Sequence, residues 1–332
     1  MNDASIETPM EPLKAAPESV VSEGRIKQNK KPKLTKKAVS RLVFYCVGMA
    51  IPLTLLGIFY FGVNIKSIIM SFQSWDMVQG RYIWSDFTNF KQLFSEMGSN
   101  PTFGYMFRNT MLGFFIPEAV CFVPSIMTSY YVYKKFRCYR FFRVVMYLPS
   151  ILSVLALSIV QKYMLELGYP AIVEALTGKT VDGLLTNPNT TIPALIGVSI
   201  WFGFCQGVMI YPATMSSIPD SCIEAAQIDG CSVWKEFTRI VVPMIWPTIV
   251  VKFVADLCGM MSIDLQVFNM LGENADGAFQ TVGYYLYTGA LHANSSSMPM
   301  LSAFGLFLSV IMVPVVLCVR KLLLKVGPKT DM

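Results

Sequence analysis

Six apolar stretches alternate with polar segments along this chain, and each stretch is about 20 residues long. A helix of that length crosses the ~30 Å hydrocarbon core of a bilayer with all of its backbone hydrogen bonds made internally. The pattern therefore predicts an all-α integral membrane protein with six transmembrane helices. The predicted spans are residues 42–63, 109–132, 144–164, 192–215, 242–264 and 299–319.

The composition agrees with this interpretation and argues against a soluble domain. Of 332 residues, 54% are hydrophobic and only 14% are charged, whereas about a quarter of a soluble domain is charged. The formal charge of +6 does not by itself indicate a nucleic-acid partner, because basic residues gathered in short loops are what orients membrane helices.

The distribution of basic residues predicts the orientation of the chain. Most of the 27 Lys and Arg side chains lie before residue 42, in the segment 133–143, at Lys235 and Arg239, or after residue 319. Six spans and the positive-inside rule then place both termini and the segment between the fourth and fifth spans in the cytoplasm. The opposite face carries only Lys66, Arg81, Lys91, Arg108 and Lys179.

Spans and charges divide the chain into three parts. Residues 1–40 are polar and end in a lysine-rich run, so we expect a disordered cytoplasmic tail whose lysines lie against anionic lipid. Residues 41–325 form the six-helix transmembrane domain, and residues 326–332 form a short cytoplasmic tail.

Few residues suggest chemistry of the chain's own. The eight cysteines form no CxxC pair, and the single histidine, His292, has no neighbouring ligand type, so neither structural disulfides nor a metal site is expected. No nucleophile with a matching base stands out, and the GxxxxGK[ST] phosphate-binding motif is absent from the sequence. We therefore expect no enzyme activity and no cofactor on this chain.

A short amphipathic module interrupts the apolar pattern between the fourth and fifth spans, within residues 217–240. Asp220 or Ser221 can cap a first helix, Gly230 can end it, and Ser232 can cap a second. Small and apolar residues on such helices suit a groove on a partner. The apolar side chains expected to anchor it there are Ile223, Ile228, Trp234 and Phe237.

The module has a specific pattern of small, acidic and apolar residues that follows Pro219: Glu224, Ala225, Ala226, Asp229, Gly230, Phe237, Ile240 and Pro243. At these positions it resembles the EAA loop in the permease subunits of binding-protein-dependent ABC importers, in which a proline usually precedes the motif. The resemblance implies a type I importer permease fold in which the loop is a coupling helix that fits a cleft on a cytoplasmic ATPase. The expected ATPase-coupling residues are Glu224, Ala225, Ala226, Asp229, Gly230 and Phe237.

Further matches extend the resemblance to about residues 41–325, in the carbohydrate-importer branch that includes the maltose-type permeases. They are Asn109-Thr110, Leu148-Pro149, Trp201 with Gly203, and the segment 267–291. The chain departs from the larger maltose-type subunit because it has six predicted spans and no large insertion, and GENADGA stands where a Gly-Gly-Pro is usual.

The resemblance also implies a cellular setting. The chain would be a multi-pass protein of the bacterial cell membrane that pairs with a second permease subunit, a cytoplasmic ATPase dimer and an extracytoplasmic solute-binding protein. ATP and Mg²⁺ would bind to the ATPase, and the solute would be a sugar or oligosaccharide.

Two helical faces are candidates for the solute route. Ser199, Phe202, Gly203 and Gln206 share one face of the fourth span, and Lys252, Asp256, Met260 and Ile263 share one face of the fifth. A charge facing lipid costs about 2.5–3.5 kcal/mol on insertion scales, so the second face should point into the bundle. With the position that resemblance adds after Leu148-Pro149, the candidate substrate-binding residues are Ser150, Ser199, Phe202, Gly203, Gln206, Asp256 and Met260.

Two alternatives remain open at this stage. Lys252 and Asp256 could form an internal salt bridge without touching solute. The chain could also be an ion-coupled secondary transporter that uses Glu118, Asp256 and Asp264, although that alternative leaves the EAA-like module unexplained.

Overall fold

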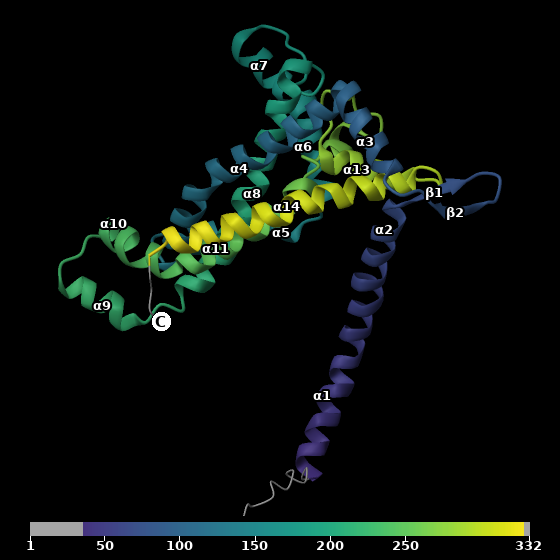
Figure 1. The fold of residues 1–332 in the computed structure, drawn as a ribbon. Helices are drawn as coiled ribbons and strands as arrows, with labels where there is room; N and C mark the ends of the chain where they lie inside the picture. The colour runs from purple at the N-terminus through teal and green to yellow at the C-terminus, as the bar shows by residue number, and fades with distance from the viewer. Residues whose placement is uncertain (1–35, 329–332) are drawn as a thin grey trace, which may run out of the picture. The chain divides into compact units, whose positions relative to one another are not determined.

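The computed structural model describes residues 36–328, which are almost entirely helical (Figure 1). The predicted disorder of residues 1–35 and the last residues of the C-terminal tail, 329–332, lie outside this described part. The elements in chain order are α1 (Lys36–Leu55), η1 (Leu56–Gly62), α2 (Val63–Ser71), β1 (Gln73–Asp76), β2 (Arg81–Trp84), α3 (Thr88–Ser99), α4 (Pro101–Tyr133), α5 (Tyr139–Ile151), α6 (Val154–Tyr163), η2 (Met164–Gly168), α7 (Tyr169–Thr177), α8 (Pro188–Met215), α9 (Asp220–Ile228), α10 (Val233–Glu236), η3 (Phe237–Val241), α11 (Val242–Gly259), η4 (Met260–Ser262), α12 (Val267–Leu271), α13 (Val282–Leu291) and α14 (Met298–Val326).

The described part of the chain divides into two units, with the boundary between Ile58 and Phe59. In the described part of the first unit, α1 begins at Lys36, so residues 36–40 are helical rather than part of a disordered tail. Its large apolar side chains, such as Phe44 and Ile51, are exposed, as expected for a surface that faces lipid.

Within residues 36–328, five helices are long and apolar enough to cross a membrane: Val43–Ser71, Pro101–Tyr133, Pro188–Met215, Val233–Ser262 and Met298–Val326. They correspond to five of the six predicted spans, and most extend beyond the predicted bounds. The structure confirms a mostly helical membrane protein with five or six candidate spans.

The third predicted span, 144–164, is not one straight helix. It is a pair of helices, Tyr139–Pro149 and Val154–Thr177, bent by 94° at the break between them. Pro149 lies at the end of the first helix and has no N–H for the last turn, and Leu152 and Ser153 after it have extended backbone. This region counts as a sixth span only if the bent pair crosses as one unit.

A small β-hairpin is the other feature that the apolar pattern did not predict. Strands β1 and β2 are antiparallel, and Trp75 pairs with Tyr82. Asp76 closes the turn because its Oδ1 accepts hydrogen bonds from the backbone N–H groups of Val78 and Gln79.

Helices α4 and α8 pack closely at the centre of the second unit. A Cβ placed on Gly207 of α8 would lie 2.7 Å from the Ser125 Cβ of α4, so only glycine allows this approach. On the same side, the Cys121 thiol donates to the Ile200 carbonyl oxygen at 3.1 Å. This pair of helices forms one wall of the candidate site.

The N-terminal part of α4 binds the segment that leads into α13. The Asn109 side-chain amide donates to the carbonyl oxygens of Ala278 and Gln280 at 2.8 and 2.9 Å, and Thr110 Oγ1 accepts from the Val282 N–H at 2.9 Å. Both side chains are fully buried. The Asn-Thr pair found by resemblance therefore has a physical role, because it satisfies buried backbone groups that would otherwise be unpaired.

Candidate functional site

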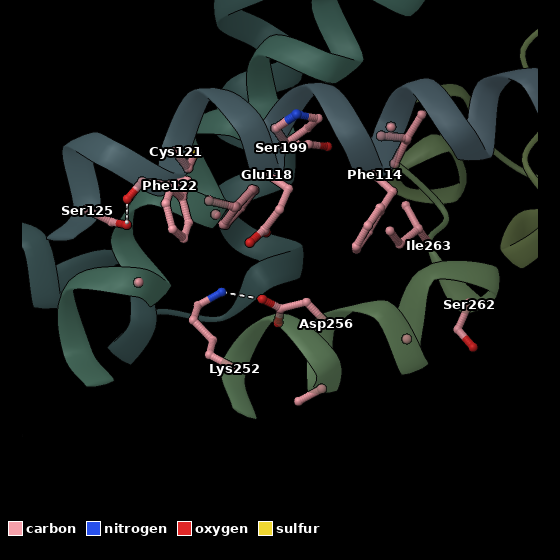
Figure 2. Close-up of a pocket in the computed structure, with 18 of the residues that line it drawn as sticks. Phe114, Glu118, Cys121, Phe122, Ser125, Ser199, Lys252, Asp256, Ser262 and Ile263 are labelled. Atoms are coloured by element: carbon pink, nitrogen blue, oxygen red, sulfur yellow. Dashed lines mark hydrogen bonds and ion pairs between the residues drawn. The ribbon is translucent and has the colours of Figure 1, made fainter. Parts of the chain in front are cut away.

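A cavity of about 410 Å³ lies between α4, α8 and α11, and the residues that follow η4 border it (Figure 2). Its wall combines aromatic rings, small residues and a few polar groups. This mixture is usual for sites that bind small molecules, where apolar surface gives contact and a few polar groups fix orientation.

Among the described residues, four charged ones line this cavity: Glu118, Lys252, Asp256 and Asp264. Lys252 and Asp256 of α11 form an ion pair one helical turn apart, with side chains 14% and 34% exposed. Glu118 of α4 points toward that pair in Figure 2. No ion pair involves Glu118 within residues 36–328, so its carboxylate is not committed to a cation of the chain's own in this part.

The structure brings together most of the residues predicted from the two helical faces. Ser199, Phe202 and Gly203 of α8 line the cavity opposite Lys252 and Asp256. Gly203 leaves room there: among the described residues, a Cβ at this position would approach only Cys121 Sγ, at 3.7 Å. The two faces predicted from helical spacing therefore converge on one space.

The prediction that Met260 lines the solute site is wrong. Its side chain is 4% exposed and packs in an apolar cluster with Phe114, Leu257 and Met312. The cause is the end of α11 at Gly259: Met260 begins the 3₁₀ turn η4, in which the α-helical spacing no longer holds.

Two further candidates, Ser150 and Gln206, have side chains outside the described part of the structure. Their backbones belong to α5 and α8. Their assignment to the solute site therefore stays a prediction.

Gln266 is a cavity residue that the sequence did not reveal. It has a left-handed backbone with φ 59°, and its side-chain oxygen accepts from Ser158 Oγ of α6 at 2.9 Å and from Asn269 Nδ2 at 2.7 Å. Asp264 Oδ1 accepts from the Gln266 N–H at 3.0 Å. No periodic pattern marks these residues, because they lie in the irregular segment between η4 and α12.

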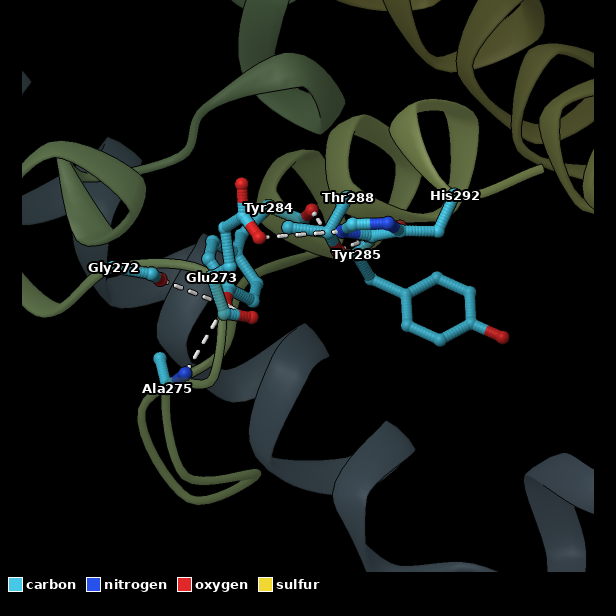
Figure 3. Close-up of polar contacts among 7 residues, drawn as sticks. All are labelled: Gly272, Glu273, Ala275, Tyr284, Tyr285, Thr288 and His292. Carbon is cyan, nitrogen blue, oxygen red and sulfur yellow. Dashed lines mark hydrogen bonds and ion pairs between the residues drawn. The ribbon is translucent and has the colours of Figure 1, made fainter.

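Hydrogen bonds of the Tyr284 side chain stabilise the conformation of the segment 267–291 (Figure 3). Its hydroxyl donates to the Glu273 carbonyl oxygen at 2.6 Å and accepts from the Ala275 N–H at 3.2 Å. His292 Nε2 lies 3.6 Å from a Glu273 carboxylate oxygen, and both side chains are more than half exposed. Burial raises the pKa of the nearby Tyr285 hydroxyl.

The predicted module between the fourth and fifth spans exists as α9, a turn and α10. The turn needs Gly230, whose φ of 72° lies in the left-handed region. Ser232 caps α10 as predicted, and its hydroxyl accepts from the Lys235 N–H at 3.4 Å. Neither Asp220 nor Ser221 caps α9, because the N-cap position is Pro219 and has no side-chain bond.

The six predicted coupling residues divide into two groups. Glu224, Ala225, Asp229 and Gly230 are exposed, so they form an accessible surface. Ala226 and Phe237 are only 8% and 7% exposed and face the chain's own interior.

The four predicted apolar anchors divide in the same way. Ile223 and Phe237 belong to a buried cluster and cannot anchor a partner, which corrects the prediction. Ile228 and Trp234 are 86% and 60% exposed. The amphipathic pattern revealed the two faces, but it could not show which one turns inward.

Comparisons with known proteins agree with this arrangement. The chain is 25% identical over 248 residues to the multiple sugar-binding transport system permease protein MsmF of Streptococcus mutans, covering 74% of this chain and 84% of that protein. It is 23% identical over 240 residues to the lactose transport system permease protein LacF of Rhizobium radiobacter, covering 71% and 78%.

The fold is also similar to a chain in the crystal structure of a bacterial ABC transporter involved in the import of the acidic polysaccharide alginate. The TM-score is 0.72 at 20% sequence identity, and the match covers 88% of this chain and 99% of that one. A sequence model of the binding-protein-dependent transport system inner membrane component matches residues 122–330, a stretch that includes the α9–α10 module and two of the three cavity helices. The chain therefore belongs to this family of inner membrane components.

Proposed function

We propose that this chain is the permease subunit of an ATP-driven importer and that it forms, with a second permease, the pathway for a sugar or oligosaccharide. The observation that carries the proposal is the family match across residues 122–330, which covers both the module and the helices α8 and α11 of the cavity. The relatives are described as permeases for multiple sugars and for lactose, which supports a carbohydrate solute.

The cavity supplies groups suited to such a solute. Phe202 offers a ring face to the apolar side of a sugar, and Ser199 and Glu118 offer hydrogen-bonding groups. A carboxylate accepts strong, charge-assisted hydrogen bonds, and the Lys252–Asp256 pair holds the opposite wall. We propose that these residues orient the solute and that Ser150 and Gln206 belong to the same pathway.

The exposed face of the module is the proposed ATPase contact. Glu224, Ala225, Asp229 and Gly230 lie on it with the apolar side chains of Ile228 and Trp234. Small residues let a partner's backbone approach, and exposed apolar side chains next to them can bury surface in a groove. The proposed partners are a cytoplasmic ATPase dimer, a second permease subunit and an extracytoplasmic solute-binding protein.

The protein is a multi-pass component of the inner membrane. We propose that both termini and the α9–α10 module face the cytoplasm, because the basic residues concentrate on that side. ATP and Mg²⁺ then belong to the ATPase partner. This arrangement accounts for the module, which an ion-coupled secondary transporter would not need.

The test is reconstitution of the full complex in liposomes, with the ATPase on one side and the binding protein on the other. We expect uptake of labelled oligosaccharide that needs ATP and persists when ionophores remove ion gradients. Glu224→Ala should abolish solute-stimulated ATP hydrolysis, whereas Glu174→Ala, an exposed glutamate on α7, should not. Uptake that depends on an ion gradient instead of ATP would contradict the proposal.

A further inference from the structure

A second buried ion pair lies outside the cavity, where the module joins the membrane helices. Glu236 ends α10 and is 3% exposed. Its Oε1 lies 2.7 Å from Lys134 Nζ and accepts a hydrogen bond from the Tyr130 hydroxyl at 3.0 Å. Tyr130 lies in the last turn of α4 and Lys134 directly follows that helix, so the contact joins segments more than a hundred residues apart in the sequence.

This arrangement differs from the local role that the sequence suggests for Glu236. Its spacing from Ser232 is close to that of a capping box, in which the glutamate would turn back to its own helix. The carboxylate instead reaches a different helix, and the α10 cap is made by Ser232 alone. The glutamate is therefore committed to a contact between elements.

Stability alone is a poor explanation for such a contact. Desolvation of two charges offsets much of their attraction, and apolar residues of similar volume are often as stabilising as a buried pair. An apolar alternative is at hand, because the pair borders a cluster that includes Tyr130, Ile223 and Phe237. The best-attested use of buried charge is to fix one arrangement among several.

The position of the contact indicates which arrangement it fixes. Glu236 leads through η3 directly into α11, which carries Lys252 and Asp256. Lys134 follows α4, which carries Glu118. The contact thus ties together the cytoplasmic ends of two helices that line the cavity, next to the Ile223 side chain of α9.

We propose that Glu236 is a positioning residue for transport: through Lys134 and Tyr130 it makes α4 follow the α9–α10 module when the ATPase moves that module. Glu236 touches neither solute nor nucleotide in this role. The inference rests on the proposed importer function and adds a specific connection between the module and the cavity.

The test compares variants of the complete complex in liposomes. Glu236→Gln and Lys134→Met each remove the ion pair, and Lys134→Glu combined with Glu236→Lys restores it in reverse. Lys135→Met is the matched control, since Lys135 is exposed and forms no ion pair among the described residues. The readouts are the amount of assembled complex, the rate of ATP hydrolysis and the solute imported per ATP hydrolysed.

We expect the single variants to assemble and hydrolyse ATP while importing about 2- to 30-fold less solute per ATP, the range for residues that carry coupling between sites. The reversed pair should recover most of this loss, and the control should show none. Unchanged solute per ATP in both single variants would overturn the proposal. So would loss of assembly and uptake in equal proportion without recovery in the reversed pair.

A second measurement does not depend on transport. Spin labels at the exposed positions 137 and 239, in a cysteine-free background, report the separation between the end of α4 and the start of the fifth span. We expect one narrow distance distribution with and without nucleotide in the native pair, and a broader, nucleotide-dependent one in Glu236→Gln. Identical distance distributions in the native protein and in Glu236→Gln would overturn the proposed connection between the module and α4, even if the complex imports sugar. If the expected distances are found but ATP-driven uptake is absent, the result counts against the importer function alone.

Discussion

At the scale of single residues, the charges in the cavity are the most informative feature. Lys252 is 14% exposed, and its partner Asp256 is 34% exposed. A lone ammonium group at this depth would be costly, so Asp256 has a structural task even if it also contacts solute. Glu118 forms no ion pair among the described residues. We therefore expect neutralisation of Asp256 and neutralisation of Glu118 to have different effects on the stability of the protein.

Neutralising Asp256 should lower both stability and uptake, whereas neutralising Glu118 should lower uptake alone. Asp256→Asn leaves Lys252 without its partner, and breaking a buried pair costs about 3–5 kcal/mol, less where the group is part exposed. Thermal unfolding and uptake of the purified complex separate the two effects, with the exposed Asp182→Asn as control. A Glu118→Gln variant with full uptake would remove Glu118 from the solute route.

A second prediction at this scale follows from the hydrogen bonds of the Asn109 side-chain amide. Asn109→Ala leaves the carbonyl oxygens of Ala278 and Gln280 without their donor, at about 1–3 kcal/mol for an unsatisfied buried group. We expect a lower unfolding temperature and greater proteolysis between residues 272 and 281. Asn189→Ala, at an exposed position of α8, should change neither, and equal effects of the two substitutions would contradict the anchoring role.

At the scale of elements, the α9–α10 module has one face for its own chain and one for a partner. Ile223→Ala should destabilise the chain by about 2–5 kcal/mol, because it leaves a cavity in a buried cluster. Ile228→Ala should leave the unfolding temperature of the isolated chain unchanged and weaken ATPase binding, because Ile228 is 86% exposed. Thermal unfolding measures the first effect and co-purification with the ATPase measures the second. If Ile228→Ala destabilised the chain and Ile223→Ala only weakened ATPase binding, the assignment of the two faces would be contradicted.

Elements with a strong period could be predicted from the sequence, and irregular ones could not. The length of the apolar stretches predicted five of the spans. The helical spacing predicted the faces that contain Ser199 and Asp256, and both residues line one cavity. The bend after Pro149 could not be foreseen, since most prolines in these helices, such as Pro117 in α4, leave the helix continuous. Gln266 and Glu236 were missed as contacts between elements because only tertiary packing brings Ser158 and Lys134 to them.

At the scale of the whole molecule, the orientation in the membrane decides which surface meets ATP. We expect a membrane-impermeant thiol reagent on intact cells to label a cysteine at position 296 and not one at 235, in a cysteine-free background. Both positions are exposed, so accessibility in the fold does not limit the comparison. Labelling at 235 would place the module outside the cell and exclude an ATPase contact.

The central claim is that the exposed face of α9 binds the ATPase, and photo-crosslinking tests it most directly. A benzophenone amino acid replaces Ile228 on this face or Val251, which is 68% exposed on α11, in the assembled complex. We predict a crosslink to the ATPase from position 228 and none from position 251. Absence of that crosslink from position 228 in a complex that still contains the ATPase would contradict the claim.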